Sequence, residues 1–444
     1  MSDSKTVSSK YAWVVAGAGF LTQIIACWGV QVFGMTLPSI SADLGVEKTS
    51  LAIAASVFGL CYAGFSVVAG NLVDKIGVRK VVGFGALIAS LCLIATGVFA
   101  QGREGIIFGY TAFGIFLASV GAGVTPKLIS NWFSSHTRGK GFALCIVGGS
   151  FGGVLMGIIA PIFINAGGWR LCFEMVGVIG VVVAVLSFIF IRDSPAAMGT
   201  VPYGSEKEAV QVVDQKVVDH VAKTESTGAR IARLFKMPNL WKMIVVYVCF
   251  QLYYMMHQTY FVSALTSAGM DITIAGLVSS CLYVGICVGQ IAFPSLSDKF
   301  ARKNILGILM VVTAGAYLIL VPMLRNMGNI PGAVVLMMVV CLGVCIAANA
   351  MLQTTMTELF PPDLRGAGPG MVSTFGLIGR FGGPLLGGWF IATICGGDML
   401  SYPFLVAPLA LIGGLVALFT LPKTGGKYGD PLAEQYESGL TEEQ

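Results

Sequence analysis

Residues 70–80 read GNLVDKIGVRK and directly follow a long apolar segment. Residues 294–303 read PSLSDKFARK and follow another apolar segment in the second half of the chain. Each copy places an Asp-Lys pair, Asp74-Lys75 or Asp298-Lys299, a few residues before two basic side chains. Recurrence at the same place in each half indicates an internal repeat, and therefore two halves built on one plan.

The composition excludes a water-soluble protein. The 444 residues are 56% hydrophobic and 11% charged, whereas soluble domains carry roughly 25% charged residues. The mean hydropathy is +0.83, and disorder requires the opposite balance of low hydrophobicity and high charge. Lipid must therefore be the solvent for most of this chain.

Twelve apolar segments reach the length of about 20 residues that a helix needs to cross a bilayer core. The first of them is too long for a cleavable signal peptide and lacks a small-residue cleavage site. We predict an all-α membrane protein with six-helix halves at residues 1–191 and 241–422, a cytoplasmic linker at 192–240 and a cytoplasmic tail at 423–444. The predicted spans are residues 12–36, 51–71, 81–100, 106–132, 141–163, 171–191, 241–265, 273–296, 305–325, 332–357, 370–394 and 402–421.

The basic residues orient these spans. With the N-terminus in the cytoplasm, the external loops hold only Lys48, Arg103, Arg170 and Arg325 of the 27 Lys and Arg residues. Because cytoplasmic loops are enriched in Lys and Arg, both termini are predicted to be cytoplasmic, in the cell inner membrane.

Several classes of function are not supported by the sequence. The 11 cysteines are mostly single residues in apolar segments, and no Cys/His cluster has metal-ligand spacing. No nucleophile–base pair is evident, and the basic residues follow topology rather than forming a patch. We expect no enzyme, no cofactor and no nucleic-acid partner, and we expect a monomer.

The first repeat copy resembles the loop motif Gly-x3-Asp-Arg/Lys-x-Gly-x-Arg/Lys-Arg/Lys of the major facilitator superfamily, and the resemblance covers the whole chain. The second copy departs from it, because Pro294 and Ala301 stand where glycines are usual. The linker start, from Arg192 to Gly204, resembles organic-anion members of the oxalate/formate-exchanger, monocarboxylate and aromatic-acid-symporter kind. The resemblance implies a major facilitator fold of twelve transmembrane helices, and duplicated carriers place their site between the halves near the midplane.

The loop motif also predicts a conformational latch. Gly70 permits close helix approach, while Asp74 at the membrane boundary can accept hydrogen bonds from a neighbouring helix N-terminus and pair with Arg79. In the second half, Asp298 and Arg302 are the corresponding latch candidates. The alternative is a plain positive-inside anchor, which we favour for the lysines of the motif.

Two cations lie in the predicted spans, whereas no Asp or Glu lies at the centre of any span. Ionisable residues inside a membrane are costly and mark function by default. Arg380, before an expected helix break at Pro384, and Lys127, after Pro126, therefore predict a cavity for an anion. In carboxylate-transporting relatives the eleventh helix often holds a basic substrate residue, so the resemblance supports Arg380. The alternatives are an arginine bound to freed backbone carbonyls and a lysine that extends to the headgroups.

Polar side chains in three other spans are substrate-site candidates: His257, Tyr254, Gln258, Gln31 and Gln353. Tyr253, His257 and Tyr260 share one helix face, and Gln251, Tyr254 and Gln258 share another that we expect to be adjacent. Here tyrosines can stack on a flat acid, and His257 can hydrogen-bond it or take a proton. The alternatives are an interfacial aromatic belt and interhelical amide bonds.

These observations predict a secondary active transporter that moves a small organic anion, a carboxylate, by alternating access, either in exchange or with a proton. One alternative is a proton-driven exporter of drugs or other amphiphiles, but the Gly-Pro of the drug-antiporter signature is absent from residues 148–153. The other is a non-transporting membrane sensor, against which the short linker counts.

Overall fold

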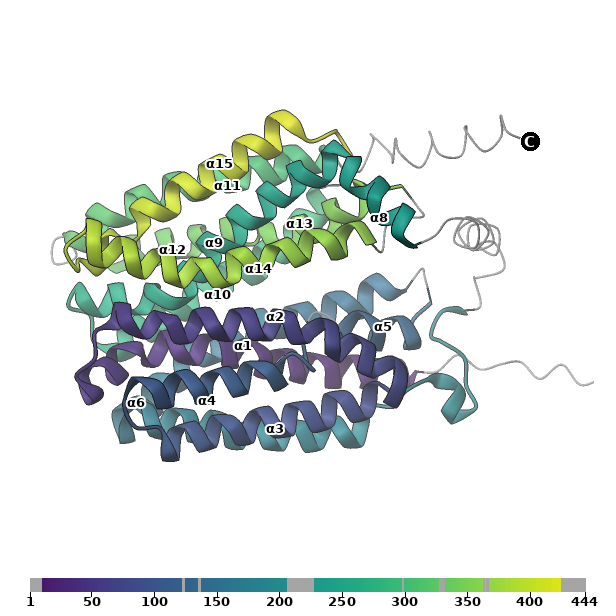
Figure 1. The fold of residues 1–444 in the computed structure, drawn as a ribbon, viewed down its shortest axis with the longest axis horizontal. Coiled ribbons are helices and arrows are strands. Elements are labelled where there is room, and N and C mark those ends of the chain that lie inside the picture. The colour runs from purple at the N-terminus through teal and green to yellow at the C-terminus, as the bar shows by residue number, and fades with distance from the viewer. Residues whose placement is uncertain are drawn as a thin grey trace, which may run out of the picture. The chain divides into compact units, whose positions relative to one another are not determined.

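A computed structural model describes residues 10–121, 124–134, 137–205, 227–297, 299–326, 332–361, 364 and 367–424. The chain divides into two compact helical units, and each is considered by itself. The first contains Met1–Val212 and Asp271–Ser280, and the second contains Val213–Met270 and Cys281–Gln444. Figure 1 labels the helices of both.

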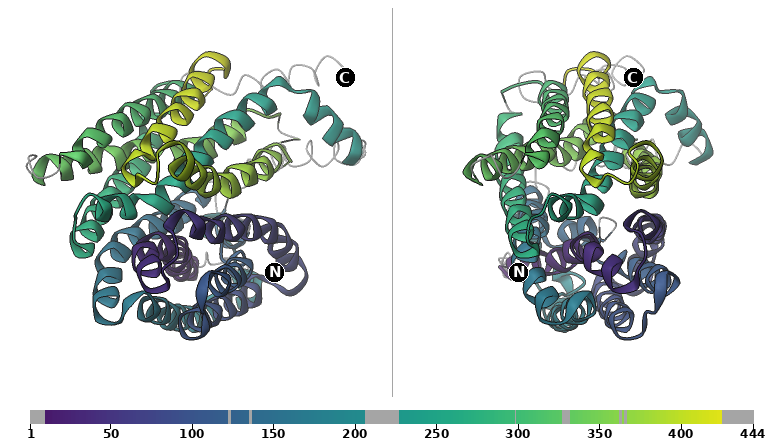
Figure 2. Two further views of the ribbon diagram at one scale, coloured as in Figure 1. Left: turned by 60° about the vertical axis from the view of Figure 1, so that its left-hand side comes forward. Right: turned by 90° about the vertical axis from the view of Figure 1, so that its left-hand side faces the viewer.

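The first unit is formed by long helices that pack side by side, as the views of Figure 2 also show. Its helices are α1 (Tyr11–Leu44), α2 (Lys48–Ile76), α3 (Val78–Phe99), α4 (Gly102–Leu117), α5 (Thr125–Trp132) and α6 (Arg138–Phe190). Two predicted spans, 141–163 and 171–191, fall within α6, which is interrupted at Gly167 and Gly168. Gly168 has a φ of 73°, a conformation that only glycine adopts readily, so the chain turns there without a separate loop.

The second unit contains α8 (Thr227–Lys236), α9 (Pro238–Ser267), most of α10 (Ile272–Leu296), α11 (Arg302–Arg325), α12 (Gly332–Ile346), α13 (Ala348–Glu358), α14 (Ala367–Trp389) and α15 (Pro403–Thr420). The expected break at Pro384 is wrong, because α14 continues through it. The helix ends instead in a π-helical turn, Phe390–Ile394. Proline is tolerated inside membrane helices where neighbours satisfy the freed backbone groups. The missing N–H of Pro384 frees the carbonyl four residues earlier in α14. The carbonyl of Pro384 itself accepts a hydrogen bond from Tyr260 of α9 at 2.6 Å, which ties the two helices together.

Glycines let the principal helices of each unit approach closely. In the first unit, a Cβ at Gly152 on α6 would lie 2.9 Å from the Cα of Ile24 on α1, and Trp28 donates to the Gly152 carbonyl at 2.7 Å. In the second unit, a Cβ at Gly383 on α14 would lie 2.7 Å from the Leu252 carbonyl of α9. Small residues of this kind allow van der Waals packing between membrane helices.

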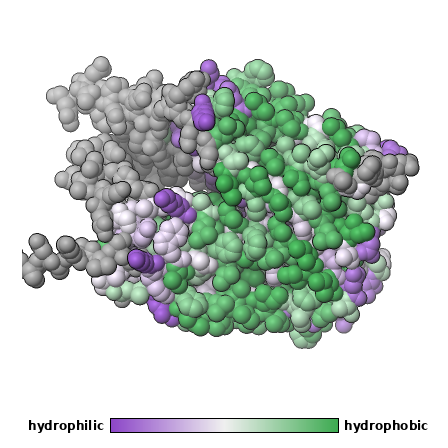
Figure 3. All heavy atoms as spheres, turned by 180° about the vertical axis from the view of Figure 1, so that it is seen from behind, coloured by the Kyte–Doolittle hydropathy of each residue, from purple (hydrophilic) through white to green (hydrophobic). Residues whose placement is uncertain are grey.

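The helices carry a lipid-facing surface. Among the described residues, nine helices are long and apolar enough to cross a membrane. Phe108 on α4 and Phe419 on α15 are 77% and 80% exposed, which suits lipid rather than water. On the face drawn in Figure 3, hydrophobic residues cover a broad area and hydrophilic ones gather toward the edges. The prediction of a multi-pass, all-α membrane protein is confirmed.

Candidate functional site

Arg380 on α14 and Gln251 on α9 form the central polar contact between these two helices. With the Gln251 amide oriented by its hydrogen bonds, its oxygen accepts from Arg380 Nε at 2.7 Å and from Nη2 at 3.2 Å. Gln251 is buried, whereas Arg380 is partly accessible. A neutral amide thus holds one edge of the guanidinium, which has five donors in a rigid fork. Sequence reasoning named Gln251 only as a member of a polar face.

Arg380 can reach Gln251 because α14 lies against α9 through glycine. The residue before it, Gly379, would place a Cβ 2.5 Å from the Gln251 Cβ and 2.9 Å from the Val248 carbonyl. Neither helix contains an Asp or Glu. The cation therefore sits between two helices that themselves supply no acidic side chain.

The polar residues of α9 form two sets on neighbouring faces of the helix. At 100° per residue, Gln251 and Tyr253 differ by about 200° around the axis, whereas Tyr254 and His257 differ by only about 60°. Gln258 lies on the Gln251 side, where it exchanges hydrogen bonds of 2.6 and 2.9 Å with Tyr283 of α10. Helix α14 contacts both sets, because Arg380 bonds Gln251 and the Pro384 carbonyl accepts from Tyr260. Tyr254, on the Gln251 side, is half-buried and stacks on Phe250 at 5.6 Å.

His257 belongs to the other set and faces a group of buried tyrosines. Its ring lies 5.8 Å from that of Tyr317 on α11, which lies 6.3 Å from that of Tyr402. His257 is 3% exposed and Tyr253, Tyr317 and Tyr402 are fully buried. Within the described chain, the Nδ1 of His257 and the three hydroxyls have no hydrogen-bond partner. An unsatisfied buried polar group costs about 1–3 kcal/mol, so four together call for an explanation.

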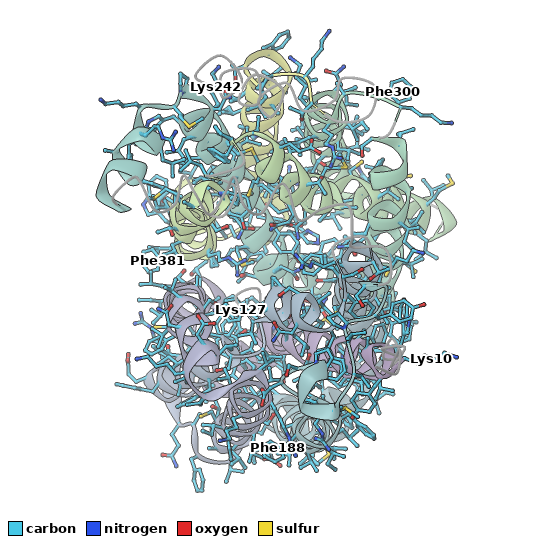
Figure 4. All side chains as sticks on the ribbon, turned by 90° about the vertical axis from the view of Figure 1, so that its right-hand side faces the viewer. Lys10, Lys127, Phe188, Lys242, Phe300 and Phe381 are labelled. Atoms are coloured by element: carbon cyan, nitrogen blue, oxygen red, sulfur yellow. The ribbon has the colours of Figure 1, made fainter. Side chains whose placement is uncertain are left out.

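Lys127 lies in the first unit, on α5, and is labelled in Figure 4. Its Nζ donates to Asp74 Oδ2 and to the Gly70 carbonyl, both at 2.7 Å. The structure thereby joins a predicted substrate residue to two predicted latch residues. The side chains of Lys127 and Asp74 are 37% and 64% exposed.

Arg79 does not take the expected part in this latch. Its backbone N–H donates to Asp193 at 2.9 Å and its Nε to the Phe188 carbonyl at 2.8 Å, while the guanidinium lies 4.6 Å from the Phe188 ring centre. The expected Asp74–Arg79 pair is therefore replaced by Asp74–Lys127 and Arg79–Asp193. Asp193 begins the linker, and sequence reasoning had assigned it no partner.

The start of the linker is held against the first unit. Tyr203 donates its backbone N–H to the Trp132 carbonyl at 2.9 Å. Its own carbonyl accepts from the Ser134 N–H at 3.0 Å and from the Thr137 hydroxyl at 2.7 Å. The linker therefore begins as a docked segment rather than as a free tether.

The remaining candidates are placed as follows. Arg302 forms an ion pair of 2.8 Å with Glu358, and their side chains are 17% and 21% exposed. Asp298 lies outside the described residues. Gln31 is buried on α1 with an unpartnered Oε1, whereas Gln353 is exposed on α13.

Comparison with known sequences gives matches over nearly the whole chain. A profile of the Major Facilitator Superfamily matches residues 19–271 and 261–440. The inner membrane transport protein RhmT of Escherichia coli (strain K12) is 25% identical over 403 residues, covering 87% of this chain and 89% of that protein. The benzoate transport protein of Acinetobacter baylyi is 23% identical over 457 residues, covering 95% and 91%. The membrane sensor protein UhpC of Salmonella typhimurium is 24% identical over 412 residues, covering 88% and 86%.

Solved structures share the fold at lower identity. A D-xylose-proton symporter superimposes with a TM-score of 0.74 at 16% identity, covering 94% of this chain and all of that one. An inward-facing bacterial homolog of the human lysosomal transporter Spinster gives a TM-score of 0.68 at 14% identity, covering 93% and 94%. At these identities the likeness extends to the fold alone.

Proposed function

The chain belongs to the major facilitator superfamily, and we propose that it carries a small organic anion, a carboxylate, across the cytoplasmic membrane. Family membership indicates a transporter that works by alternating access rather than an enzyme. The proposed substrate class rests on one observation: Arg380 is held on α14 by the neutral amide of Gln251.

The chemistry of this pair supports an anion. Gln251 accepts from Nε and one terminal nitrogen, which orients the planar guanidinium without neutralising it. Arginine binds carboxylates in a two-point geometry, and the substrate is proposed to engage Arg380 in this way. A bound carboxylate neutralises the guanidinium. The free-energy cost of burying Arg380 when the carrier closes is then lower with substrate bound than without it.

Energetics favour coupling to a second solute. Moving an anion into a cell with an interior-negative potential of 100 mV costs about 2.3 kcal/mol of free energy per charge. Accumulation therefore requires either exchange for another anion or entry with a proton. The proposal includes both modes. An acid substrate is compatible with the similarity to the benzoate transport protein, whose name specifies an acid.

The other candidates take different roles in this proposal. Gln258 and Tyr254 lie on the Arg380 side of α9 and are proposed to contact the part of the substrate remote from its carboxylate. Gln31 and Gln353 are retained as substrate candidates on α1 and α13. Lys127, paired with Asp74, is proposed to act in the latch with Gly70 rather than as an independent cation.

The topology from the charge pattern is part of the proposal. Both termini are cytoplasmic, residues 1–191 and 241–422 form the two halves, residues 192–240 link them, and residues 423–444 form a cytoplasmic tail. The protein is proposed to act as a monomer in the lipid bilayer, with a carboxylate as its substrate and a proton as its partner in the symport mode.

A membrane sensor is the second candidate, because the chain is 24% identical to the sensor UhpC over most of its length. A drug exporter is a third and has no comparable support. Counterflow in proteoliposomes separates them: a carrier exchanges a labelled carboxylate, an exporter moves lipophilic cations, and a sensor moves neither. The anion proposal is refuted if purified, monodisperse protein moves no acid from a panel of mono- and dicarboxylates, aromatic acids and sugar phosphates.

A further inference from the structure

We propose that His257 binds the proton that accompanies the anion, within a buried cluster formed by Tyr253, His257, Tyr317 and Tyr402. This inference rests on the proposed function and decides between its two modes, exchange and proton symport. The chemical species at the site is a proton, with the imidazole as its acceptor.

The geometry of the cluster is the first support. His257 and Tyr253 occupy one face of α9, Tyr317 comes from α11, and Tyr402 lies at the N-terminal end of α15. A ring contact of 5.8 Å joins His257 to Tyr317, and one of 6.3 Å joins Tyr317 to Tyr402. Within the described residues, His257 Nδ1 and all three hydroxyls are unpartnered, although each residue is at least nine-tenths buried. A site of four polar atoms that the fold itself leaves unsatisfied points to a group that is bound part of the time.

The chemistry of the site fits a proton. Neutral imidazole has one nitrogen that accepts, and once protonated it donates from both. Each neighbouring hydroxyl has lone pairs that can accept from the imidazolium and a hydrogen that can turn toward the neutral ring. The cluster can therefore hydrogen-bond either form by rotation of hydroxyls, without an acidic partner.

His257 is the side chain of this cluster with a nitrogen that can accept a proton. Helices α9, α11, α14 and α15 contain no Asp or Glu, and His257 is the one histidine that the structure describes. The charged and titratable groups on α9 besides His257 are Lys242, Tyr247, Cys249, Tyr253, Tyr254 and Tyr260. Those on the neighbouring elements include Arg233, Lys236, Arg302, Lys303, Tyr317, Arg325, Cys345, Glu358, Arg380 and Tyr402, and Glu358 pairs with Arg302.

The proton site at His257 is separate from the anion site at Arg380, and helix α9 connects the two. Tyr253 and His257 lie about 160° and 120° around α9 from Gln251, the residue that holds Arg380. The anion and the proton are thus proposed to bind different faces of one helix. Movement of α9 during alternating access would change the surroundings of both ligands together.

The test uses wild-type protein and His257→Gln in proteoliposomes. Counterflow of the labelled acid at equal pH reports anion binding and reorientation, and accumulation driven by an inward proton gradient reports coupling. Internal acidification during anion entry is followed with a trapped pH dye. We expect His257→Gln to keep counterflow within about threefold of wild type, and to lose both gradient-driven accumulation and acidification. The double variant His136→Gln/His220→Gln removes the other two histidines and is expected to stay coupled.

A second variant, Tyr317→Phe, tests the cluster without removing His257, in case His257→Gln does not fold. Tyr317→Phe keeps the imidazole and removes one hydroxyl, so it is expected to stay coupled with a shifted pH dependence of accumulation. The inference is overturned if wild type moves the acid without protons, if His257→Gln accumulates it normally, or if monodisperse His257→Gln loses counterflow as well. Wild type that moves no acid at any pH refutes the proposed function itself.

Discussion

Replacing Gln251 with glutamate gives Arg380 a permanent counter-charge, and we expect this to block the anion site. The substitution changes one polar atom and keeps the length of the side chain. The wild-type amide oxygen already lies 2.7 Å from Nε and 3.2 Å from Nη2, so the introduced carboxylate meets the guanidinium without rearrangement. A transported carboxylate must then displace an internal one.

The size of the effect follows from this geometry. Two unit charges about 4 Å apart attract by about 4 kcal/mol at an effective dielectric constant of 20. Loss of only a third of that energy from substrate binding lowers affinity about tenfold, because 1.4 kcal/mol corresponds to a factor of ten. We therefore expect Gln251→Glu to raise KM for the acid by at least about tenfold.

The matched control is Asn239→Asp. It makes the same change from amide to carboxylate on α9, twelve residues before Gln251 and at the start of the helix. Its KM should stay within about threefold of wild type. The assay is initial-rate uptake in proteoliposomes over a range of acid concentrations, with protein in each preparation quantified. Equal KM values for Gln251→Glu and wild type would refute the reasoning, and so would equal increases in the two acidic variants.

Three further outcomes are expected. Gly383→Ala should lower the thermal unfolding temperature in detergent, because its Cβ would lie 2.7 Å from a backbone carbonyl of α9, whereas Gly370→Ala meets no atom within 4 Å and should be neutral. A double-mutant cycle of Lys127→Met and Asp74→Asn should give non-additive transport rates but a stability coupling of at most about 1 kcal/mol, since the pair is partly exposed; additive rates would count against a latch. Burial alone would raise the pKa of Asp398, but hydrogen bonds from Ser401, Leu400 and Arg325 outweigh it and the pKa is lowered. The associated stability is present above the usual pKa of aspartate and is lost as pH falls below it, so Asp398→Asn should flatten the acid limb of an unfolding-temperature profile.

Hydropathy and repetition were sufficient to predict the membrane fold and the family. Apolar segments and lone in-span charges are local properties, so their positions can be counted along the chain. Boundaries were harder to predict. The turn at Gly167 and Gly168 lets two predicted spans run on as α6, and α14 continues through Pro384, a residue that membrane helices tolerate.

The contacts of the candidate site could not be predicted from the sequence, because they join residues on different helices. Lys127 pairs with Asp74, which lies 53 residues away in the sequence. Nothing in the motif shows that Asp74 pairs with Lys127 rather than with Arg79. Likewise, the partners of α9 depend on which helices flank each side. Spacing correctly separates Gln251 from His257, but it cannot show that α14 takes one and α11 the other.

Arg380 as the anion-binding residue is the central claim, and counterflow with wild type and Arg380→Gln in the same proteoliposome preparation tests it most directly. The account predicts that wild type exchanges one class of labelled carboxylate, and that the variant, inserted at equal density and equally monodisperse, loses this exchange. A variant that exchanges the acid at the wild-type rate would contradict it, and so would wild type that moves lipophilic cations but no acid.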